Sequence, residues 1–140
     1  MLTIRVVTPD GVTFNDTVDE VIVPTTTGEI SILTNHIPLV SVLAPGELRV
    51  KKGDQEIPMV VSHGIIEIRP GNEVYVLADS AERAEHIDVS RAEVAKERAE
   101  ALLKEQHISD TDFARVQAAM EKELARVRVG KKYRKLPPLT

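Results

Sequence analysis

The sequence predicts an α+β fold, an N-terminal antiparallel β-sandwich followed by a C-terminal antiparallel two-helix hairpin. Before residue 87, short alternating apolar segments are interrupted by turn residues at roughly the 8–12-residue spacing of sandwiches and barrels. After it, the chain is rich in Ala, Glu, Lys and Arg, with almost no turn residues before Gly130, which favours helices. The change occurs within the hexamer Ile87-Asp88-Val89-Ser90-Arg91-Ala92.

The β half is divided by clear turn residues. The first predicted strand alternates over residues 2–7 and ends at Pro9-Asp10-Gly11, and the second, over residues 18–23, is stopped by Pro24. Residues 79–86 are expected to be a polar connection to the helices. The remaining predicted strands span residues 29–33, 39–43, 47–51, 57–61, 64–69 and 73–78.

The first helix is predicted from about residue 88 to residue 105. Ser90 and Glu93 fit a capping box, and Asp88 is a competing N-cap two residues earlier. The residues on the apolar side of this helix are mostly small, so a second helix can approach it closely. These residues are Ala92, Ala95, Ala99 and Leu102 or Leu103.

A second helix should follow the break at Ile108, with Ser109 or Thr111 as its cap and Gly130 as its end. Because two helices of this size are marginal alone, the hairpin needs the β half or a partner, and it can therefore occupy more than one position. We expect domains at residues 1–84 and 85–130 and a basic, proline-containing tail at 131–140 that is extended or flexible. The apolar stripe of the second helix is Phe113, Val116, Met120, Leu124 and Val127.

Composition excludes several classes of function. The chain has no cysteine, its histidines lack metal-ligand spacing, and no nucleophile-elbow, paired-acid or dinucleotide-binding pattern occurs. We therefore expect a non-enzyme without a metal. The low aromatic content argues against nucleic-acid binding, and no apolar run approaches the roughly 20 residues of a membrane span. These features predict a soluble cytoplasmic protein without direct membrane insertion.

Charge is divided unevenly along the chain. Residues 1–86 carry 6 Lys and Arg against 13 Asp and Glu, whereas residues 87–140 carry 12 against 9. Either the helices present ordinary solvated faces, or the basic half meets an acidic partner surface.

The hexamer at the boundary also allows two interpretations. Asp88 and Arg91 lie about one helical turn apart, and Arg98 shares a face with Arg91. With Lys122 and Arg126 from the second helix, these arginines could form a cationic cage for phosphates. Asp88 or Glu82 could then accept a hydrogen bond from an amino group or ribose. The alternative is an N-cap followed by salt bridges within the helices.

Three stretches of the sequence follow one another in a specific order. They are Gly28-Glu29-Ile30-Ser31-Ile32-Leu33-Thr34-Asn35-His36-Ile37-Pro38-Leu39, Pro70-Gly71-Asn72-Glu73-Val74-Tyr75-Val76-Leu77-Ala78-Asp79, and the hexamer with Ala95-Lys96-Glu97-Arg98-Ala99. In this order they resemble the epsilon subunits of bacterial F-type ATP synthases. The resemblance implies a non-catalytic central-stalk subunit at the cytoplasmic face of the plasma membrane. Its sandwich would dock on the gamma subunit and the c ring, and its mobile hairpin would inhibit ATP hydrolysis.

The resemblance also implies roles for individual residues. ATP, a regulatory ligand in some members, would be held by Glu82, Ile87, Asp88, Arg91, Ala92, Arg98, Lys122 and Arg126. Lys122 stands where those members use an arginine, so the bidentate fork is lost there. Glu29 and His36 would face the c ring. When the hairpin is extended, it would contact the catalytic alpha/beta subunits on the beta subunit. The candidate residues for this contact are Arg115, Lys122, Arg126 and Arg128. The alternative function is a stand-alone nucleotide-sensing module.

Overall fold

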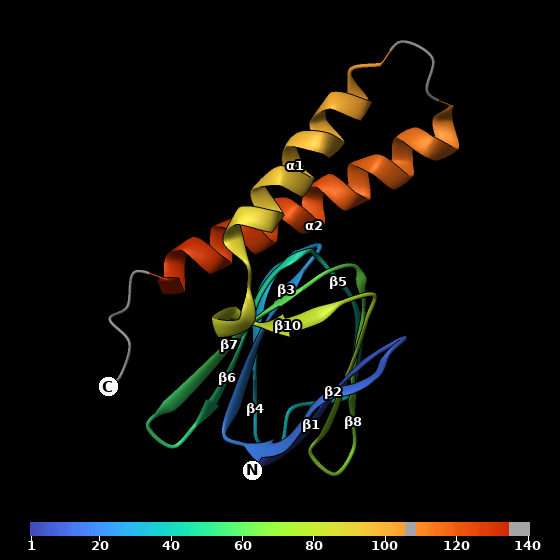
Figure 1. Ribbon diagram of the computed structural model, residues 1–140. Helices are drawn as coiled ribbons and strands as arrows, with labels where there is room; N and C mark the ends of the chain where they lie inside the picture. Colours follow the sequence, from blue (N-terminus) through green and yellow to red (C-terminus); the bar gives the residue numbers. More distant parts are fainter. Residues whose placement is uncertain (106–108, 135–140) are drawn as a thin grey trace. The chain divides into compact units, whose positions relative to one another are not determined.

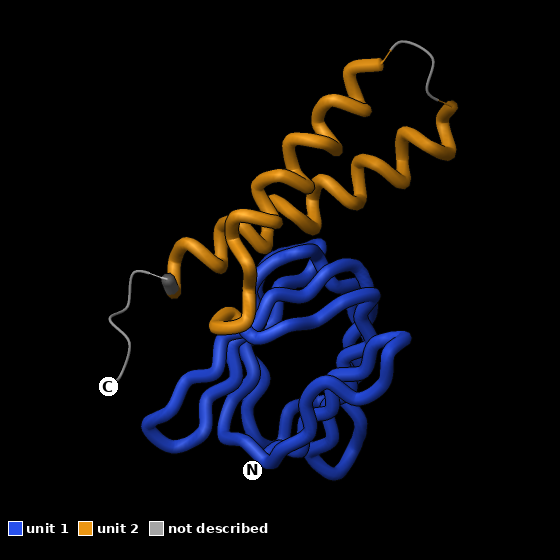
Figure 2. Tube along the Cα trace, in the orientation of Figure 1, with its two compact units in different colours: residues 1–83 blue, residues 84–140 orange. Residues whose placement is uncertain are grey.

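The computed structural model describes residues 1–105 and 109–134 of the chain. These residues form two compact units, Met1–Arg83 and the segment beginning at Ala84 (Figure 2). The first unit is all β and the second is helical, as the composition of the two halves predicts. Each unit is described by itself below.

The β unit is a ten-stranded sheet with the order β10-β7-β6-β3-β5-β8-β9-β1-β2, in which β4 pairs with β3 (Figure 1). The pairs are antiparallel except for β1 with β9, which is parallel. The strands are β1 (Leu2–Thr8), β2 (Gly11–Val18), β3 (Glu20–Thr25), β4 (Gly28–Leu33), β5 (Leu39–Leu43), β6 (Gly46–Lys52), β7 (Gln55–Val61), β8 (Gly64–Arg69), β9 (Glu73–Ala78) and β10 (Ala81–Arg83).

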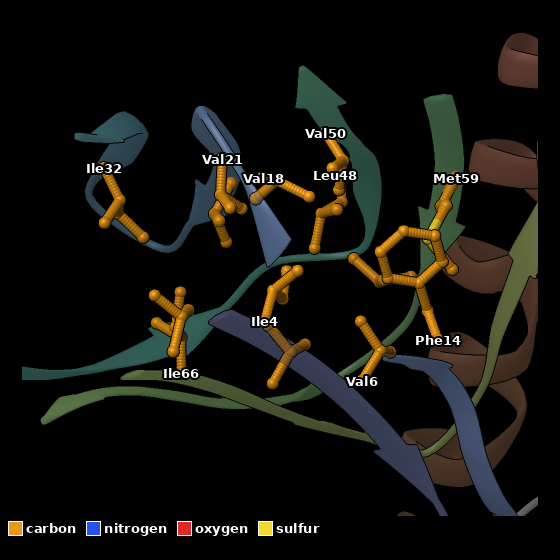
Figure 3. Close-up of a cluster of buried hydrophobic side chains, with 14 of the residues drawn as sticks. Ile4, Val6, Phe14, Val18, Val21, Ile32, Leu48, Val50, Met59 and Ile66 are labelled. Carbon is orange, nitrogen blue, oxygen red and sulfur yellow. The ribbon is translucent and has the colours of Figure 1, made fainter. Parts of the chain in front are cut away.

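Alternation along the strands builds one core. On β1, Leu2, Ile4 and Val6 are fully buried while the residues between them are not. Ile4 on β1 and Leu48 on β6 belong to the same buried cluster although their strands lie far apart in the sheet order (Figure 3). The sheet therefore folds over onto itself, and the predicted β-sandwich is confirmed.

The sequence prediction missed two strands. The chain from Gly11 to Val18 forms β2. This strand buries only Phe14 and Val18, and its mostly polar sequence shows no clear alternation. Its register with β1 shifts between Val6 and Val7, which marks a bulge. The predicted second strand consequently begins later, at Glu20.

The second missed strand is β10, in the stretch expected to be a polar connection. Ala81, Glu82 and Arg83 pair with Val61, Val60 and Met59 of β7, respectively. Three partly buried residues carry too little alternation to be recognised in the sequence. A short 3₁₀ turn, η1 (Ala84–His86), follows and begins the helical unit.

The helical unit consists of α1 (Val89–Leu103) and α2 (Asp110–Arg134), which pack against each other as a hairpin (Figure 1). Asp88 caps α1 by accepting a hydrogen bond from the Arg91 amide, so the capping-box interpretation of Ser90 is wrong, because Ser90 already lies inside the helix. Ser109 caps α2 by accepting from the Asp112 amide. No helix in the described ranges is long and apolar enough to cross a membrane.

Two details of α2 differ from the prediction. Gly130 does not end the helix, which continues to Arg134, so residues 131–134 are helical rather than an extended tail. The rest of that predicted tail lies outside the described residues. The predicted stripe is also only partly buried. Phe113 and Leu124 are exposed, whereas the helix buries Ala125, Val127, Val129 and Gly130 near its end.

Candidate functional site

The hexamer at the start of α1 combines a helix cap with an exposed ion pair. Asp88 Oδ1 lies 3.1 Å from the Arg91 amide nitrogen, and Asp88 Oδ2 lies 3.7 Å from Arg91 Nε. The Arg91 side chain is 87% exposed. Ala92 is fully buried and Ile87 is half-buried. The apolar members of the hexamer therefore anchor the segment, while Asp88 and Arg91 remain accessible to a ligand.

A groove beside this hexamer contains the second predicted arginine. It has a volume of about 350 Å³ and is lined by Ser90, Arg91, Val94, Ala95 and Arg98. Arg91 and Arg98 thus share one face of α1, as their spacing predicts. This volume is at the lower end of the range of small-molecule sites. Two guanidinium groups at one open groove form a site suited to an anion such as a phosphate group.

The cations predicted on the second helix are not among the residues that line this groove. Arg126 Nη1 lies 2.8 Å from Glu123 Oε2, and both side chains are largely buried, with 20% and 12% exposure. Lys122 is half-buried, while Arg115 and Arg128 are exposed. To bind the phosphates of a ligand at the groove, Arg126 would first have to give up part of its pairing with Glu123. The cage of four cations stays a prediction.

Glu82, Glu29 and His36 lie in the β unit. Glu82 is on β10 opposite Val60. Glu29 on β4 lies 3.1 Å from Arg49 Nη2, and it therefore forms part of an acidic group around that arginine. The other acidic neighbours of Arg49 are Glu47 and Glu56.

His36 lies in the connection between β4 and β5, and its Nδ1 is 2.6 Å from the Ile37 carbonyl oxygen. The neighbouring Asn35 amide donates to Asn72 Oδ1 at 2.6 Å, which ties this connection to the β8–β9 turn. Leu33 and Ile37 are exposed beside His36. The connection is therefore a fixed surface with apolar side chains around one histidine.

The outward face of the sheet carries a candidate surface that was not predicted from the sequence. Successive register partners across five strands carry apolar side chains, and we call this set the outer apolar row: Val42, Ile65, Leu77, Val7 and Val12. All but Val7, which is half-buried, are exposed. The sequence does hold a sign of it. Ile65-Ile66 and Val76-Leu77 are adjacent apolar pairs, which place one apolar side chain on each face of a strand.

A second row of register partners lies next to the outer apolar row; it begins with the exposed Val40 and continues with the polar or aromatic residues Glu67, Tyr75, Arg5 and Asn15. The Arg69 guanidinium lies 4.1 Å from the centre of the Tyr75 ring, and that of Arg5 lies 5.9 Å away. Hydrogen bonds from Arg69 lower the pKa of the Glu67 carboxyl. Aromatic and arginine side chains beside an apolar strip are typical of protein–protein interfaces.

Two domains of a known protein family together match residues 1–131 of the chain. The β-sandwich domain of the ATP synthase delta/epsilon chain matches residues 1–84, and the long α-helix domain of the same chain matches residues 85–131. The chain belongs to the ATP synthase delta/epsilon family. This membership confirms the resemblance found in the sequence.

Individual members of the family are similar to this chain along most of their length. A protein named ATP synthase epsilon chain from Dehalococcoides mccartyi is 43% identical over 136 residues, 97% of this chain and 96% of the relative. One from Alkalihalophilus pseudofirmus is 49% identical over 115 residues, 81% of this chain and 86% of the relative.

Solved structures show the same fold. A chain in the Euglena gracilis mitochondrial ATP synthase structure containing OSCP, F1 and the c ring is 25% identical, with a TM-score of 0.74, over 89% of this chain and 78% of that one. A chain in the central stalk and c ring of the Tetrahymena thermophila enzyme is 14% identical, with a TM-score of 0.60, over 94% and 95%. The second likeness concerns the fold alone.

Proposed function

We propose that this family member is a non-catalytic central-stalk subunit of an F-type ATP synthase that docks through its β-sandwich on the gamma subunit and the c ring. The observation that carries the proposal is the outer apolar row, because a contiguous exposed apolar strip costs free energy unless a partner covers it. The solved relative at 25% identity comes from an assembly named for OSCP, F1 and the c ring. In this assembly the chain would lie at the cytoplasmic face of the bacterial plasma membrane and couple proton-driven rotation to ATP synthesis.

The two partners would use different parts of the sandwich. The outer apolar row, with Tyr75 and its arginines beside it, suits the gamma subunit, which offers a folded protein surface. The connection around His36, with exposed Leu33 and Ile37, suits the c ring, as the resemblance implies for Glu29 and His36. The pairing of Glu29 with Arg49 means that a partner cation would compete with Arg49 for this carboxylate.

Co-expression of the tagged full chain with the gamma subunit and the c ring tests this assignment. We expect the tagged chain to retain both on an affinity column and through subsequent gel filtration. Recovery of the chain as a monomer without gamma would contradict the proposal and would favour the stand-alone nucleotide-sensing module.

The helical hairpin would act as a brake on ATP hydrolysis. The exposed Arg115 and Arg128 of α2 could meet acidic segments of the catalytic beta subunits when the hairpin is extended, joined there by Lys122 and Arg126. A ligand shifts such an equilibrium only if it binds one position more tightly than the other. ATP at the α1 groove would meet this condition if Lys122 and Arg126 of α2 joined Arg91 and Arg98 around its phosphates in the folded position of the hairpin alone, and it would then relieve inhibition.

ATP binding is tested on the isolated full chain by calorimetry. We expect ATP to bind with measurable heat and the affinity to fall at least about tenfold in Arg91→Ala, because a charge-assisted hydrogen bond contributes about 1.5–3 kcal/mol. Lys104→Ala, at the other end of α1, is the matched control and should bind like the unchanged chain. Lys122→Arg should tighten binding by restoring the bidentate fork.

Equal affinity in Arg91→Ala and Lys104→Ala, or no heat at millimolar ATP, would contradict the sensing role. The docking proposal would be unaffected, since it depends on the β unit.

A further inference from the structure

The end of α2 touches the hexamer at the start of α1 without a side chain between them. A Cβ atom placed on Gly130 would lie 2.7 Å from Val89 Cγ2 and 3.0 Å from Ile87 Cγ2. Ile87 and Val89 are the two neighbours of Asp88 in the chain. The backbone of α2 therefore rests directly on the residues that flank the cap of α1.

These neighbours have little freedom to move aside. Val89 is buried and opens α1, where a β-branched side chain has one strongly preferred rotamer. Ile87 is half-buried and also β-branched. Glycine is the least favourable helix residue apart from proline. The close contact thus gives a packing reason for a glycine inside α2, where local preference disfavours it.

A second contact fixes the same end of the helix. Lys131 Nζ lies 2.8 Å from Glu93 Oε1, one turn further along α1 than Val89. Val127 and Val129, just before Gly130, are buried. The last turns of α2 therefore hold the 87–93 segment through an apolar backbone contact at Gly130 and an ion pair at Lys131.

We propose that Gly130 and Lys131 are positioning residues that form a clasp between the end of α2 and residues 87–93. The clasp holds the end of α2 against the segment that begins α1, so α2 can leave α1 only by losing the Gly130 and Lys131 contacts. This inference rests on the proposed role of the hairpin as a mobile element. A ligand that holds Asp88 and Arg91 in place would strengthen the clasp, and release of the clasp would free α2 first at its C-terminal end.

Hydrogen exchange in the isolated full chain tests the clasp, because the two explanations of Gly130 predict opposite changes in the amide exchange rate of Gly130→Ala. Helix preference alone predicts that Gly130→Ala slows amide exchange over residues 125–133. The clasp predicts about tenfold faster exchange there and over residues 87–93, because the added methyl group separates the two segments. Gln117→Ala, at an exposed position of α2 away from Gly130, is the control and should leave exchange over 87–93 unchanged.

Reversing the two charges of the Glu93–Lys131 ion pair provides a second test, which leaves Gly130 unchanged. Glu93→Lys and Lys131→Glu should each speed exchange over residues 125–133 about twofold, a modest effect for an exposed pair, and the double variant should restore the original rate. Slower exchange in Gly130→Ala, or no rescue in the double variant, would overturn the clasp. Binding of Gly130→Ala to the gamma subunit, through the β unit, reports separately on the proposed function and should be unchanged.

Discussion

Replacing Gly64 with alanine is expected to lower the free energy of unfolding by about 3 kcal/mol or more, at or beyond the upper end of the usual cost of overpacking. Gly64 begins β8 and pairs with Leu43 on one side and Ala78 on the other. A Cβ atom there would lie 1.9 Å from the Leu77 carbonyl oxygen and 2.8 Å from Ala78 Cα. Both atoms belong to the backbone, so relief requires β8 and β9 to separate. Urea unfolding measures the loss.

Gly53→Ala is the matched control for this variant. Gly53 lies in the turn between β6 and β7 with φ of +59°, and an added Cβ atom would meet nothing within 4 Å. The expected cost is about 1–2 kcal/mol, from the left-handed backbone conformation alone. If Gly64→Ala were no more destabilising than Gly53→Ala, the close approach of β8 and β9 at this point would be wrong.

Placing an arginine in the outer apolar row is expected to weaken binding to the gamma subunit at least about 100-fold, the cost typical of losing a central interface residue. Ile65 and Leu77 are register partners on β8 and β9 and are each 41% exposed. In the complex, Ile65→Arg or Leu77→Arg would bury a charge against an apolar partner. In the free chain the charge stays in water, so the free energy of unfolding should change by less than about 1 kcal/mol.

Asp54→Arg introduces the same side chain in the exposed turn between β6 and β7, two strands that contribute no residue to the row. Calorimetry with the purified gamma subunit should find its affinity unchanged. Should Leu77→Arg and Asp54→Arg bind gamma equally well, the outer apolar row would not be the docking surface.

Strands whose apolar residues alternate clearly could be predicted from the sequence because each carries its own pattern. β2 and β10 could not, since β2 buries only Phe14 and Val18 among mostly polar residues, and the three partly buried residues Ala81–Arg83 are too few to show a pattern. The prediction that Gly130 ends the second helix was wrong because the residues that decide it lie far apart in the chain. The local preference of this glycine for ending a helix is overridden by a contact with Ile87 and Val89, about 40 residues away in the chain.

The candidate sites also divide into one that local sequence spacing predicts and one that depends on the order of the strands. Arg91 and Arg98 lie on one helix, so their shared face follows from helical spacing and the groove was predictable. The outer apolar row depends on the order of five strands, and one of its steps is the parallel pairing of Val7 with Leu77. Sheet order cannot be read from alternation, so only the adjacent apolar pairs at residues 65–66 and 76–77 hinted at the row. The pairing of Arg126 with Glu123 was equally predictable from their i,i+3 spacing.

Cross-linking from the outer apolar row tests the central claim most directly. The chain contains no cysteine, so Val42→Cys, at a position 52% exposed, can carry a single photoreactive group into the assembled ATP synthase. We expect the product to join this chain to the gamma subunit, and Asp54→Cys to give no such product. Efficient assembly with no gamma product from Val42→Cys would contradict the account.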